Sequence, residues 1–517
     1  MFPRPRVVYL DHNATTPVAE DVRDAMLEVL KKIWGNPSSA HTYGRAARGI
    51  VEKARESVSG LIGCNPEQIF FTSGGTEGNN AIIKGVFAGA AGKGHIITSK
   101  IEHDSILGAC SQIEAIGGKV TYLSAGRDGL VRPEDVRAAI RPDTILISVM
   151  HANNETGAIQ PIKEIGRIAK EAGVPLHTDA VQSCGKIATD VDGLGCEFLT
   201  LTAHKINGPK GAGAVYWRGN TGWEPLIFGG SQERRYRAGT EGPHQAAGLG
   251  AAARLAKGRM DSEFKRMKIL REYFISGLMR LFPDLKINEA PAASQLPGTI
   301  NLTFPGVENV RMLAGLDCYN IFVSTGSACT ADRTQASHVL TGMGLSEKEA
   351  LSSLRISMGT TTTRRDLDYT LKVFEKIPKK IPAGFAYMDP KNLTVDRILS
   401  GETFLIDLRP PHYRLLSPTI PGAREWSHLY FERYFKHIPW DKEVVLMCVN
   451  GGLAFSAGYR LAKAGHKAVR VLQGGYNAWN SMHPGLLEQL NEKASEIMTG
   501  PSKGNFRTPI ESVLKRG

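Results

Sequence analysis

Short apolar runs, rich in β-branched and aromatic residues, recur along the first two thirds of the chain and alternate with helical stretches. The strand-like runs lie at 68–72, 95–98, 144–149, 198–201 and 213–217, and one helical stretch spans 162–172. Such runs are typical of strands buried on both faces of a sheet, and strand–helix alternation favours parallel pairing. The pattern therefore predicts a large, mostly parallel α/β domain.

Residues beyond about Asp261 follow a different pattern. A long helix is expected first, then a short strand at 299–303 and further helices, which together suit a smaller α+β domain. A segment with two prolines and a glycine at 376–384 is typical of a linker. Strand–helix alternation then resumes at 403–407, 443–448 and 468–472, over a length sufficient for a small α/β domain.

These patterns divide the chain into parts. The first part is predicted at 1–375, with a large domain at about 16–260 and a small domain made of 1–15 and 261–375. A linker at 376–388, a third domain at 389–490, and a helix and tail at 491–517 follow.

The overall composition is that of a globular protein. Of the 517 residues, 42% are hydrophobic and 22% are charged, and no apolar run approaches the length of a membrane span. The N-terminal residues lead directly into a strand-like run at Val7, without the apolar segment of a secretory signal. We therefore expect a cytoplasmic protein with no membrane partner.

The net charge of +12 is scattered along the sequence. Basic residues adjoin in pairs, such as Lys31–Lys32 and Arg234–Arg235, and no nucleic-acid-binding motif accompanies them. We interpret the charge as a solvated basic surface or a surface for an acidic protein, and we expect no direct nucleic-acid binding. The seven cysteines include no C-x-x-C pair, which argues against a disulfide framework or a metal site.

Four polar residues follow predicted strands. Asn154 follows the strand at 144–149, Asp179 and Gln182 follow a short strand, and Lys205 follows the strand at 198–201. The carboxyl ends of parallel strands form the usual ligand crevice of an α/β sheet. Pyridoxal phosphate needs such a set, because a lysine attaches it, an acid keeps its pyridine nitrogen protonated and amides suit its ring oxygen. Each residue alone fits a satisfied polar core position equally well; the four together favour the cofactor site.

Two further features fit the same cofactor. The turn at 73–80 opens a helix, so the backbone at Gly75 and the Thr76 hydroxyl are suited to bind a phosphate. His103 follows the strand at 95–98, where its ring could stack on a flat cofactor and exchange protons. Alone, the first would be an ordinary turn and the second a surface histidine.

Cys329 and Arg355 are the next candidates. Residues 323–332 are small and polar without hydrophobic periodicity, which predicts a loop around Cys329. A nucleophilic cysteine must be accessible and able to ionise, and the loop suits this role better than that of a buried structural thiol. Arg355 lies between apolar residues, so its guanidinium requires a carboxylate, either in an internal ion pair or on a ligand.

Residues 7–375 resemble the cysteine desulfurases of the NifS/IscS type, which are class-V aminotransferases of pyridoxal phosphate fold type I. The matching segments, in order, are 9–17, 35–39, 73–80, 153–157, 177–182, 204–205, 237–240 and 326–329. The resemblance implies a homodimer that acts on L-cysteine, with Thr240 reaching the phosphate of the neighbouring subunit's cofactor.

The resemblance also implies roles for individual residues. Lys205 would remove the Cα proton, His103 is a candidate to move a thiol proton, and Cys329 would attack the substrate sulfur, forming a persulfide as alanine leaves. Arg355 and Asn13 would bind the substrate, with Arg355 holding its α-carboxylate. The expected cofactor-binding residues are Gly75, Thr76, His103, Asn154, Asp179, Gln182, Thr202, His204, Lys205 and Thr240.

Segments 405–409, 420–423, 447–454 and 472–479 resemble a rhodanese domain. Cys448 opens a glycine-containing loop before a helix, where backbone N–H groups would favour a thiolate and bind an anion or a persulfide. Leu453 stands where rhodaneses usually carry arginine, which argues against thiosulfate binding. We hypothesise that Cys448 is a further catalytic residue that receives sulfur from Cys329; the alternative is a docking module without activity.

The sequence therefore predicts a cysteine desulfurase fused to a rhodanese-like sulfur carrier. Alternatives are a selenocysteine lyase or related lyase of the same fold, and a non-catalytic sulfur-protein scaffold, against which Lys205, Asp179, His103 and Cys329 together argue. The expected partner is a sulfur-acceptor protein such as an iron–sulfur scaffold, while iron–sulfur assembly, thiolated tRNA and sulfur-containing cofactors all stay open as destinations.

Overall fold

The computed structural model describes residues 6–326, 336–377, 384–449 and 451–485. The chain forms two compact units. The larger unit comprises Tyr9–Pro305 and Ala336–Leu367, and the C-terminal unit comprises Met1–Val8, Gly306–Gln335 and Asp368–Gly517.

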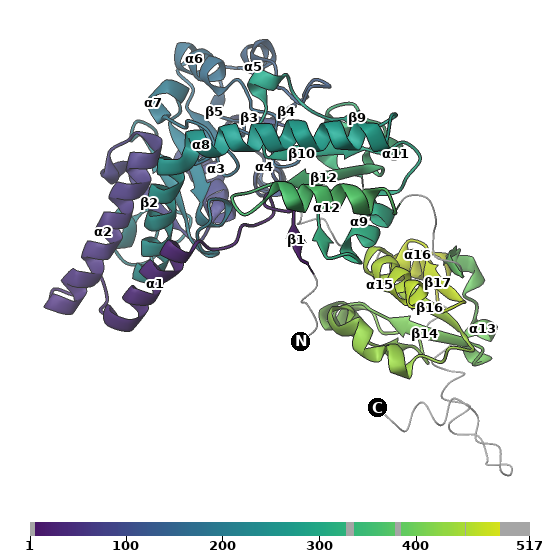
Figure 1. Ribbon diagram of the computed structural model, residues 1–517. Helices are drawn as coiled ribbons and strands as arrows, with labels where there is room; N and C mark the ends of the chain where they lie inside the picture. Colours follow the sequence, from purple (N-terminus) through teal and green to yellow (C-terminus); the bar gives the residue numbers. More distant parts are fainter. Residues whose placement is uncertain (1–5, 327–335, 378–383, 450, 486–517) are drawn as a thin grey trace. The chain divides into compact units, whose positions relative to one another are not determined.

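A seven-stranded sheet is the centre of the larger unit (Figure 1). Its strand order is β2-β8-β7-β6-β5-β3-β4, and every neighbouring pair is parallel except the two that involve β8. The strands are β2 (Ile69–Thr72), β3 (His95–Ser99), β4 (Lys119–Leu123), β5 (Thr144–Ser148), β6 (Leu176–Asp179), β7 (Phe198–Thr202) and β8 (Gly213–Trp217). This arrangement confirms the predicted mostly parallel sheet.

Both faces of this sheet are covered by helices. Successive residues of a strand point to opposite faces, and Ile96 and Ile97 of β3 indeed belong to two different apolar cores. One core includes residues of α3 and α4, and the other includes residues of α2, α6 and α8. The helices are α1 (Glu20–Lys32), α2 (Thr42–Ile62), α3 (Gly75–Gly89), α4 (Asp104–Ala115), α5 (Pro133–Ala139), α6 (Ile162–Ala172), α7 (Val191–Leu194) and α8 (Pro243–Leu281).

The long helix α8 begins earlier than the sequence pattern indicated. Gly242 precedes it and Pro243 occupies its first turn, where a missing backbone N–H costs nothing. Its first half is rich in alanine and glycine and packs on α1 and α2, so its apolar face is narrow and hard to read as a helix from the sequence.

A smaller antiparallel sheet completes the larger unit. Its order is β12-β10-β9, and Arg355 of β12 lies opposite Asn301 of β10. The strands are β9 (Lys286–Ile287), β10 (Thr299–Thr303) and β12 (Ser353–Ser357), and the accompanying helices are α10 (His338–Gly342) and α11 (Glu347–Ala350). Helix α12 (Arg364–Phe374) follows. This sheet matches the smaller α+β part that the sequence predicts.

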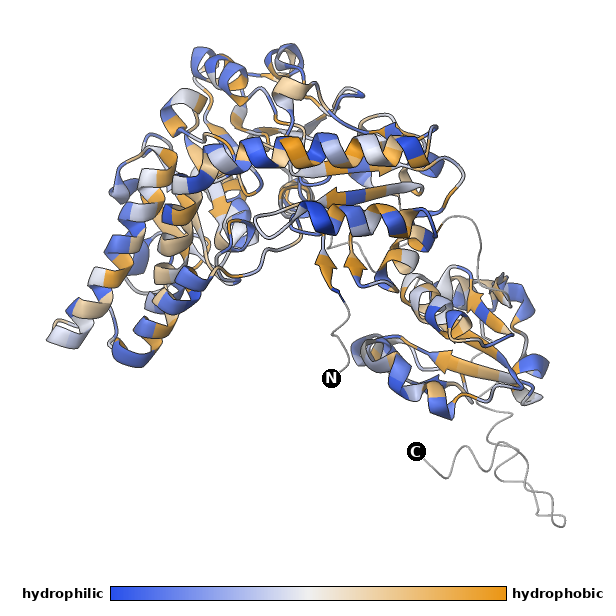
Figure 2. Cartoon of the chain, viewed as in Figure 1, coloured by the Kyte–Doolittle hydropathy of each residue, from blue (hydrophilic) through white to orange (hydrophobic). Residues whose placement is uncertain are grey.

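The C-terminal unit is built on a five-stranded, wholly parallel sheet with the order β13-β17-β16-β14-β15. In Figure 2 its central strands are largely orange, and they supply the apolar cores on both faces. The strands are β13 (Phe385–Met388), β14 (Thr403–Asp407), β15 (Arg424–Glu425), β16 (Glu443–Met447) and β17 (Val469–Leu472). The helices are α9 (Asn309–Asp317), α13 (Val395–Leu399), α14 (Pro411–Leu416), α15 (Gly452–Lys463) and α16 (Gly475–Met482).

Several short elements complete the fold. Strands β1 (Val8–Tyr9) and β11 (Ile321–Phe322) form a two-stranded sheet, and 3₁₀ turns lie at η1 (Pro66–Gln68), η2 (Ala203–Lys205), η3 (Gln232–Arg235), η4 (Ala292–Ser294), η6 (Pro390–Asn392) and η7 (His428–His437). Among the helices described, none combines the length and apolar character that crossing a bilayer requires.

Candidate active site

Lys205 lies at the carboxyl end of β7, where the strand turns into η2. Its Nζ donates hydrogen bonds to the backbone carbonyls of Asn13 and Ala14, the latter at 2.7 Å. Both acceptors come from the segment that follows β1. The N-terminal segment therefore forms one wall around the lysine amine.

Asp179 and Gln182 come from the end of β6 and the turn after it. The Asp179 carboxylate, 6% exposed, accepts hydrogen bonds from Asn79 Nδ2 at 2.7 Å and from the Val181 N–H at 2.9 Å. Gln182 Nε2 donates to the Asn13 carbonyl at 3.0 Å, which is also an acceptor for Lys205. The fold thus brings Gln182 and Lys205 onto one oxygen.

His103 is the N-cap residue of α4. Its Nδ1 accepts a hydrogen bond from the Ser105 N–H at 3.1 Å and lies 2.8 Å from Ser105 Oγ. Ser105 Oγ in turn accepts from Asn79 Nδ2 at 2.9 Å. A continuous set of hydrogen bonds therefore links His103 to Asp179.

The N-terminus of α3 is open for an anion. Gly74 precedes the helix without a side-chain cap, so the first backbone N–H groups of this 15-residue helix keep their donor capacity. A side chain at Gly75 would lie 2.8 Å from Val181, and one at Gly74 would lie 3.8 Å from Thr202 Oγ1. The helix end therefore lies close to β7 and to the turn after β6, where a side chain at position 75 would not fit.

Thr76 and Thr240 lie near this helix end in different ways. Thr76 is in the first turn of α3, and Thr240 lines a cavity of about 310 Å³ together with Ser73 and Arg237. Arg237 is paired with Glu77 of α3 at 2.9 Å. Within the chain, Thr240 thus lies in a cavity beside Ser73, two residues before α3.

His204 is held neutral beside the lysine. Burial and the nearby charges of Lys205, Lys210 and Lys186 lower the pKa of His204 to about 4. Its Nδ1 lies 3.2 Å from Thr15 Oγ1. At neutral pH this ring adds no charge to the site.

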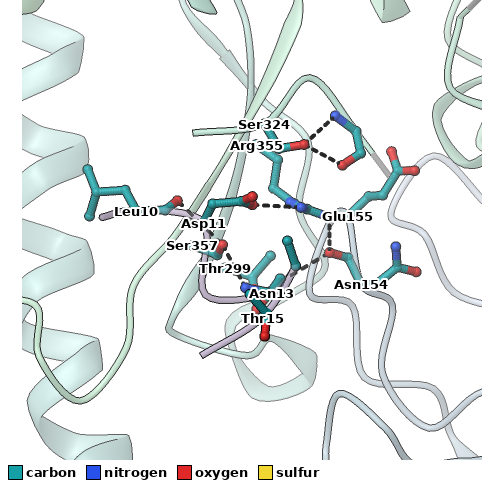
Figure 3. Close-up of polar contacts among 12 residues, drawn as sticks. Leu10, Asp11, Asn13, Thr15, Asn154, Glu155, Thr299, Ser324, Arg355 and Ser357 are labelled. Carbon is teal, nitrogen blue, oxygen red and sulfur yellow. Dashed lines mark hydrogen bonds and ion pairs between the residues drawn. The ribbon is translucent and has the colours of Figure 1, made fainter. Parts of the chain in front are cut away.

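Arg355 is almost completely buried and is paired with Asp11 (Figure 3). Its Nη2 donates to Asp11 Oδ1 at 2.8 Å and its Nη1 donates to the Asn154 carbonyl at 3.2 Å. Asn13 Nδ2 donates to that same carbonyl at 3.1 Å. Arg355 Nε and Asn154 Oδ1 are buried and lack hydrogen-bond partners among the described residues. The internal ion pair therefore exists, and the guanidinium still has donor capacity for a second carboxylate.

Cys448 lies in the C-terminal unit, directly after β16. Its thiol is 2% exposed, and Sγ accepts hydrogen bonds from the Gly451 N–H at 3.1 Å and the Ala454 N–H at 3.4 Å. Gly451 has a φ of 96°, a left-handed conformation that glycine adopts without steric cost, and this brings its N–H toward the sulfur. The loop and the start of α15 thus surround the thiol with donors.

A family model for aminotransferase class V matches residues 8–370. The cysteine desulfurase IscS of Dictyoglomus turgidum is 48% identical over 377 residues, which cover 73% of this chain and 95% of that protein. The chain belongs to the cysteine desulfurases of the class-V aminotransferase family. The resemblance drawn from the sequence is thereby confirmed.

Solved structures of similar proteins support the same fold for this desulfurase. A NifS-like protein is 37% identical with a TM-score of 0.67, and the match covers 72% of this chain and 99% of that one. A structure titled SspA in complex with cysteine is 38% identical with a TM-score of 0.60, covering 68% of this chain and 99% of that one. A rhodanese-like domain model matches residues 393–482, so the desulfurase carries this second domain.

The family uses pyridoxal phosphate, and the residues of the desulfurase fit that group. An amine, a buried carboxylate and an uncapped helix N-terminus are the three features that its aldehyde, pyridine nitrogen and phosphate require. The carboxylate Asp179 and the amine Lys205 stand at the ends of neighbouring parallel strands.

Not every predicted residue can be placed with the others. Cys329 lies outside the described residues. Cys448 belongs to the C-terminal unit, whereas Lys205, Asp179 and Arg355 belong to the larger one.

Four residues that the sequence interpretation gave no role contact the site. They are Asp11, Asn79, Ser105 and Lys186. Asp11 and Asn79 lie within matched segments, so the resemblance contained a signal for them. Lys186 Nζ donates to Gln182 Oε1 at 2.9 Å, and burial together with the charges of Lys205 and Arg355 lowers the pKa of Lys186 to about 7.

Proposed function

We propose that this chain removes the sulfur of L-cysteine as a persulfide on Cys329 and releases L-alanine, with pyridoxal phosphate attached at Lys205. The observation that carries the proposal is the convergence of Lys205, Asp179 and the open N-terminus of α3 at one end of the parallel sheet. The net reaction turns L-cysteine and the Cys329 thiol into L-alanine and a Cys329 persulfide, so it balances without an external oxidant or reductant.

Side chains of the larger unit would hold the cofactor. Asp179 would face the pyridine nitrogen, Gln182 and Asn154 the ring oxygen, and the α3 N-terminus with Thr76 the phosphate. The bound cofactor supplies an electron sink that eases bond breaking at the substrate's Cα. Lys205 donates to two backbone carbonyls, and these hydrogen bonds hold its amine at the strand end.

The substrate's α-carboxylate would bind Arg355. Asp11 already takes one edge of the guanidinium, which balances the buried charge and fixes its plane. The unpartnered Nε is a donor that a substrate carboxylate can use. Lys205 would remove the Cα proton, and His103 is the candidate to move the proton of the substrate or enzyme thiol.

Sulfur would then pass from Cys329 to Cys448. In this step the Cys448 thiolate attacks the outer sulfur of the Cys329 persulfide, a new S–S bond forms, and Cys329 leaves as a thiolate. The two N–H donors around Cys448 Sγ support this role because they stabilise negative charge on sulfur. With Leu453 in place of the arginine, the protein's own persulfide is a better-matched donor than thiosulfate.

Contacts within the C-terminal unit also support the relay. Helix α15, whose first-turn Ala454 N–H donates to Cys448 Sγ, packs on α9, and α9 precedes β11 in the chain. Arg460 of α15 lies 3.6 Å from Asp317 of α9, Lys463 Nζ lies 3.7 Å above the Tyr319 ring, and Ala314 of α9 is part of the apolar core around β16. The rhodanese-like domain is thus joined to the segment that precedes Cys329.

The same proposal includes a homodimer in which Thr240 of one subunit reaches the phosphate of the other's cofactor, and a sulfur-acceptor protein such as an iron–sulfur scaffold downstream. Crosslinking at position 240 of one subunit to α3 of the next would test the first. Crosslinks formed only within one subunit would contradict it.

A sulfide-release assay with L-cysteine and a reductant tests the activity. We expect Lys205→Ala and Cys329→Ser to lose sulfide release and Cys448→Ser to retain it. With radiolabelled cysteine, label should appear on both cysteines of the wild type and on Cys329 alone in Cys448→Ser. Undiminished release by Cys329→Ser would overturn the mechanism, and label confined to Cys329 in the wild type would overturn the relay.

The same assay separates related reactions. Turnover of selenocysteine well above that of cysteine would replace the proposal with a lyase, and no release from either amino acid would favour a scaffold.

A further inference from the structure

The hydrogen bonds between Asp179 and His103 have a defined direction. An ionised carboxylate can only accept hydrogen bonds, so Asn79 must turn its NH₂ group toward Asp179 Oδ2, 2.7 Å away. The second hydrogen of that NH₂ group then points to Ser105 Oγ at 2.9 Å. The Asn79 carboxamide oxygen is buried and has no partner among the described residues, a cost that this orientation imposes.

The hydrogen bond that Ser105 accepts from Asn79 determines the direction of its own hydrogen bond with His103. Its oxygen accepts from Asn79, so its single hydrogen is available for His103 Nδ1 at 2.8 Å. The Ser105 backbone N–H, which can only donate, also points to Nδ1 at 3.1 Å. Two donors therefore meet one ring nitrogen, and that nitrogen must carry a lone pair.

We propose that Asn79 and Ser105 are positioning residues that hold His103 as the neutral tautomer with its proton on Nε2. The N-terminus of the 12-residue helix α4 strengthens this assignment, because its partial positive charge disfavours a cationic ring at the N-cap position. Asp179 thereby reinforces, through two intermediate side chains, the tautomer that the Ser105 backbone N–H also requires.

This inference rests on the proposed function and sharpens the part of His103 in it. A ring with hydrogen on Nε2 donates a hydrogen bond from that atom and cannot accept a proton there. Taking up a proton at Nδ1 would displace both Ser105 donors. His103 therefore enters the reaction as a hydrogen-bond donor, and the first acceptor of the thiol proton is another base.

Nitrogen NMR of the full-length protein labelled with ¹⁵N-histidine tests the assignment, with and without pyridoxal phosphate. A His103→Gln variant identifies the His103 signals. We expect a neutral ring at pH 7 with Nε2 protonated and Nδ1 bare in the wild type. Ser105→Ala and Asn79→Ala should each shift the tautomer ratio toward Nδ1–H by about fivefold, the equivalent of one net hydrogen bond.

Ser111→Ala is the matched control, because Ser111 is an exposed serine of the same helix. An imidazolium or an Nδ1–H tautomer in the wild type would overturn the proposal. So would Ser105→Ala and Asn79→Ala spectra that match that of Ser111→Ala. The sulfide-release assay is read separately: its failure in the wild type would overturn the proposed function and leave the tautomer assignment intact.

Discussion

The buried ion pair between Arg55 and Glu233 allows a quantitative prediction. Both Arg55 Nη atoms contact Glu233 at 2.8 Å, and the two side chains are 5% and 2% exposed. Glu233 also accepts from the Phe71 N–H at 2.8 Å, and Arg55 donates to the Ile69 carbonyl at 2.6 Å. The pair thus ties α2 and β2 to the segment that leads to Thr240.

That segment is strained, which raises the importance of the pair. Glu233, Arg234 and Arg235 have φ values of 42°, 56° and 73°, a left-handed conformation that residues other than glycine rarely adopt. Such a backbone persists only where surrounding contacts determine it. We therefore expect Glu233→Ala to release 231–240 and to weaken cofactor retention as well as stability.

The magnitude follows from burial. Removing one partner of a buried ion pair costs about 3–5 kcal/mol, because the other charge stays uncompensated. The larger unit has about 330 residues, and an unfolding entropy of about 2.1 cal/mol/K per residue gives about 0.7 kcal/mol/K. The midpoint of its calorimetric unfolding should therefore fall by about 4–7 °C in Glu233→Ala.

The double variant Arg55→Met/Glu233→Leu is the control, because it removes both charges and keeps apolar volume. It should be more stable than either Glu233→Ala or Arg55→Ala. Hydrogen exchange of 231–240 should accelerate in the single variants. A midpoint change below about 1 °C, or a double variant whose loss equals the sum of the single losses, would refute the reasoning.

Three other predictions follow from single side chains. Burial raises the pKa of Glu102 to about 8, so this carboxyl stays protonated in the folded protein at pH values where it ionises in the unfolded chain. The free energy of unfolding of the wild type, measured in urea relative to that of Glu102→Gln, should therefore fall by about 3 kcal/mol as the pH rises from 5 to 8. A difference that stays constant over this pH range would contradict the prediction. Lys186→Met removes the donor that orients Gln182, so pyridoxal phosphate should bind about tenfold more weakly in equilibrium dialysis, and unchanged affinity would show that the contact is incidental. We expect the wild type to show no thiosulfate:cyanide sulfurtransferase activity and Leu453→Arg to give Cys448 that activity, because arginine matches an oxyanion; a wild type that is already active would remove the reason for preferring the Cys329 persulfide as the sulfur donor.

Much of the candidate site could be predicted because single residues mark strand ends. Lys205 and Asp179 follow apolar runs in the sequence, and the carboxyl ends of parallel strands meet at one edge of the sheet. Their neighbours could not be predicted in this way. Asn79 donates hydrogen bonds to Ser105 and Asp179, which lie 26 and 100 positions further along the sequence. No local sequence pattern predicts which amide side chain will bind which carboxylate.

The fold shows the same division. Apolar runs predicted the sheets of both units, since burial on both faces leaves a continuous hydrophobic signature. The packing of α9 on α15 was not predictable, because α9 is short and its buried side includes small residues such as Ala314 and Gly315. Its partner lies in another sequence module, and periodicity carries no information about tertiary neighbours.

The wall that Asn13 provides has a consequence for biogenesis. Asn13 donates its backbone N–H to Ser357 Oγ at 2.9 Å, and Asp11 binds Arg355, so the proposed substrate side of the site joins residues 344 positions apart. Lys205, Asp179 and the α3 turn leave the ribosome about 150 residues before Ser357. At about 5–20 residues per second, this interval lasts roughly 8–30 s. In the proposed function, a nascent chain would therefore complete its cofactor-binding half well before the Arg355 pocket closes, which would leave time for pyridoxal phosphate to bind before cysteine.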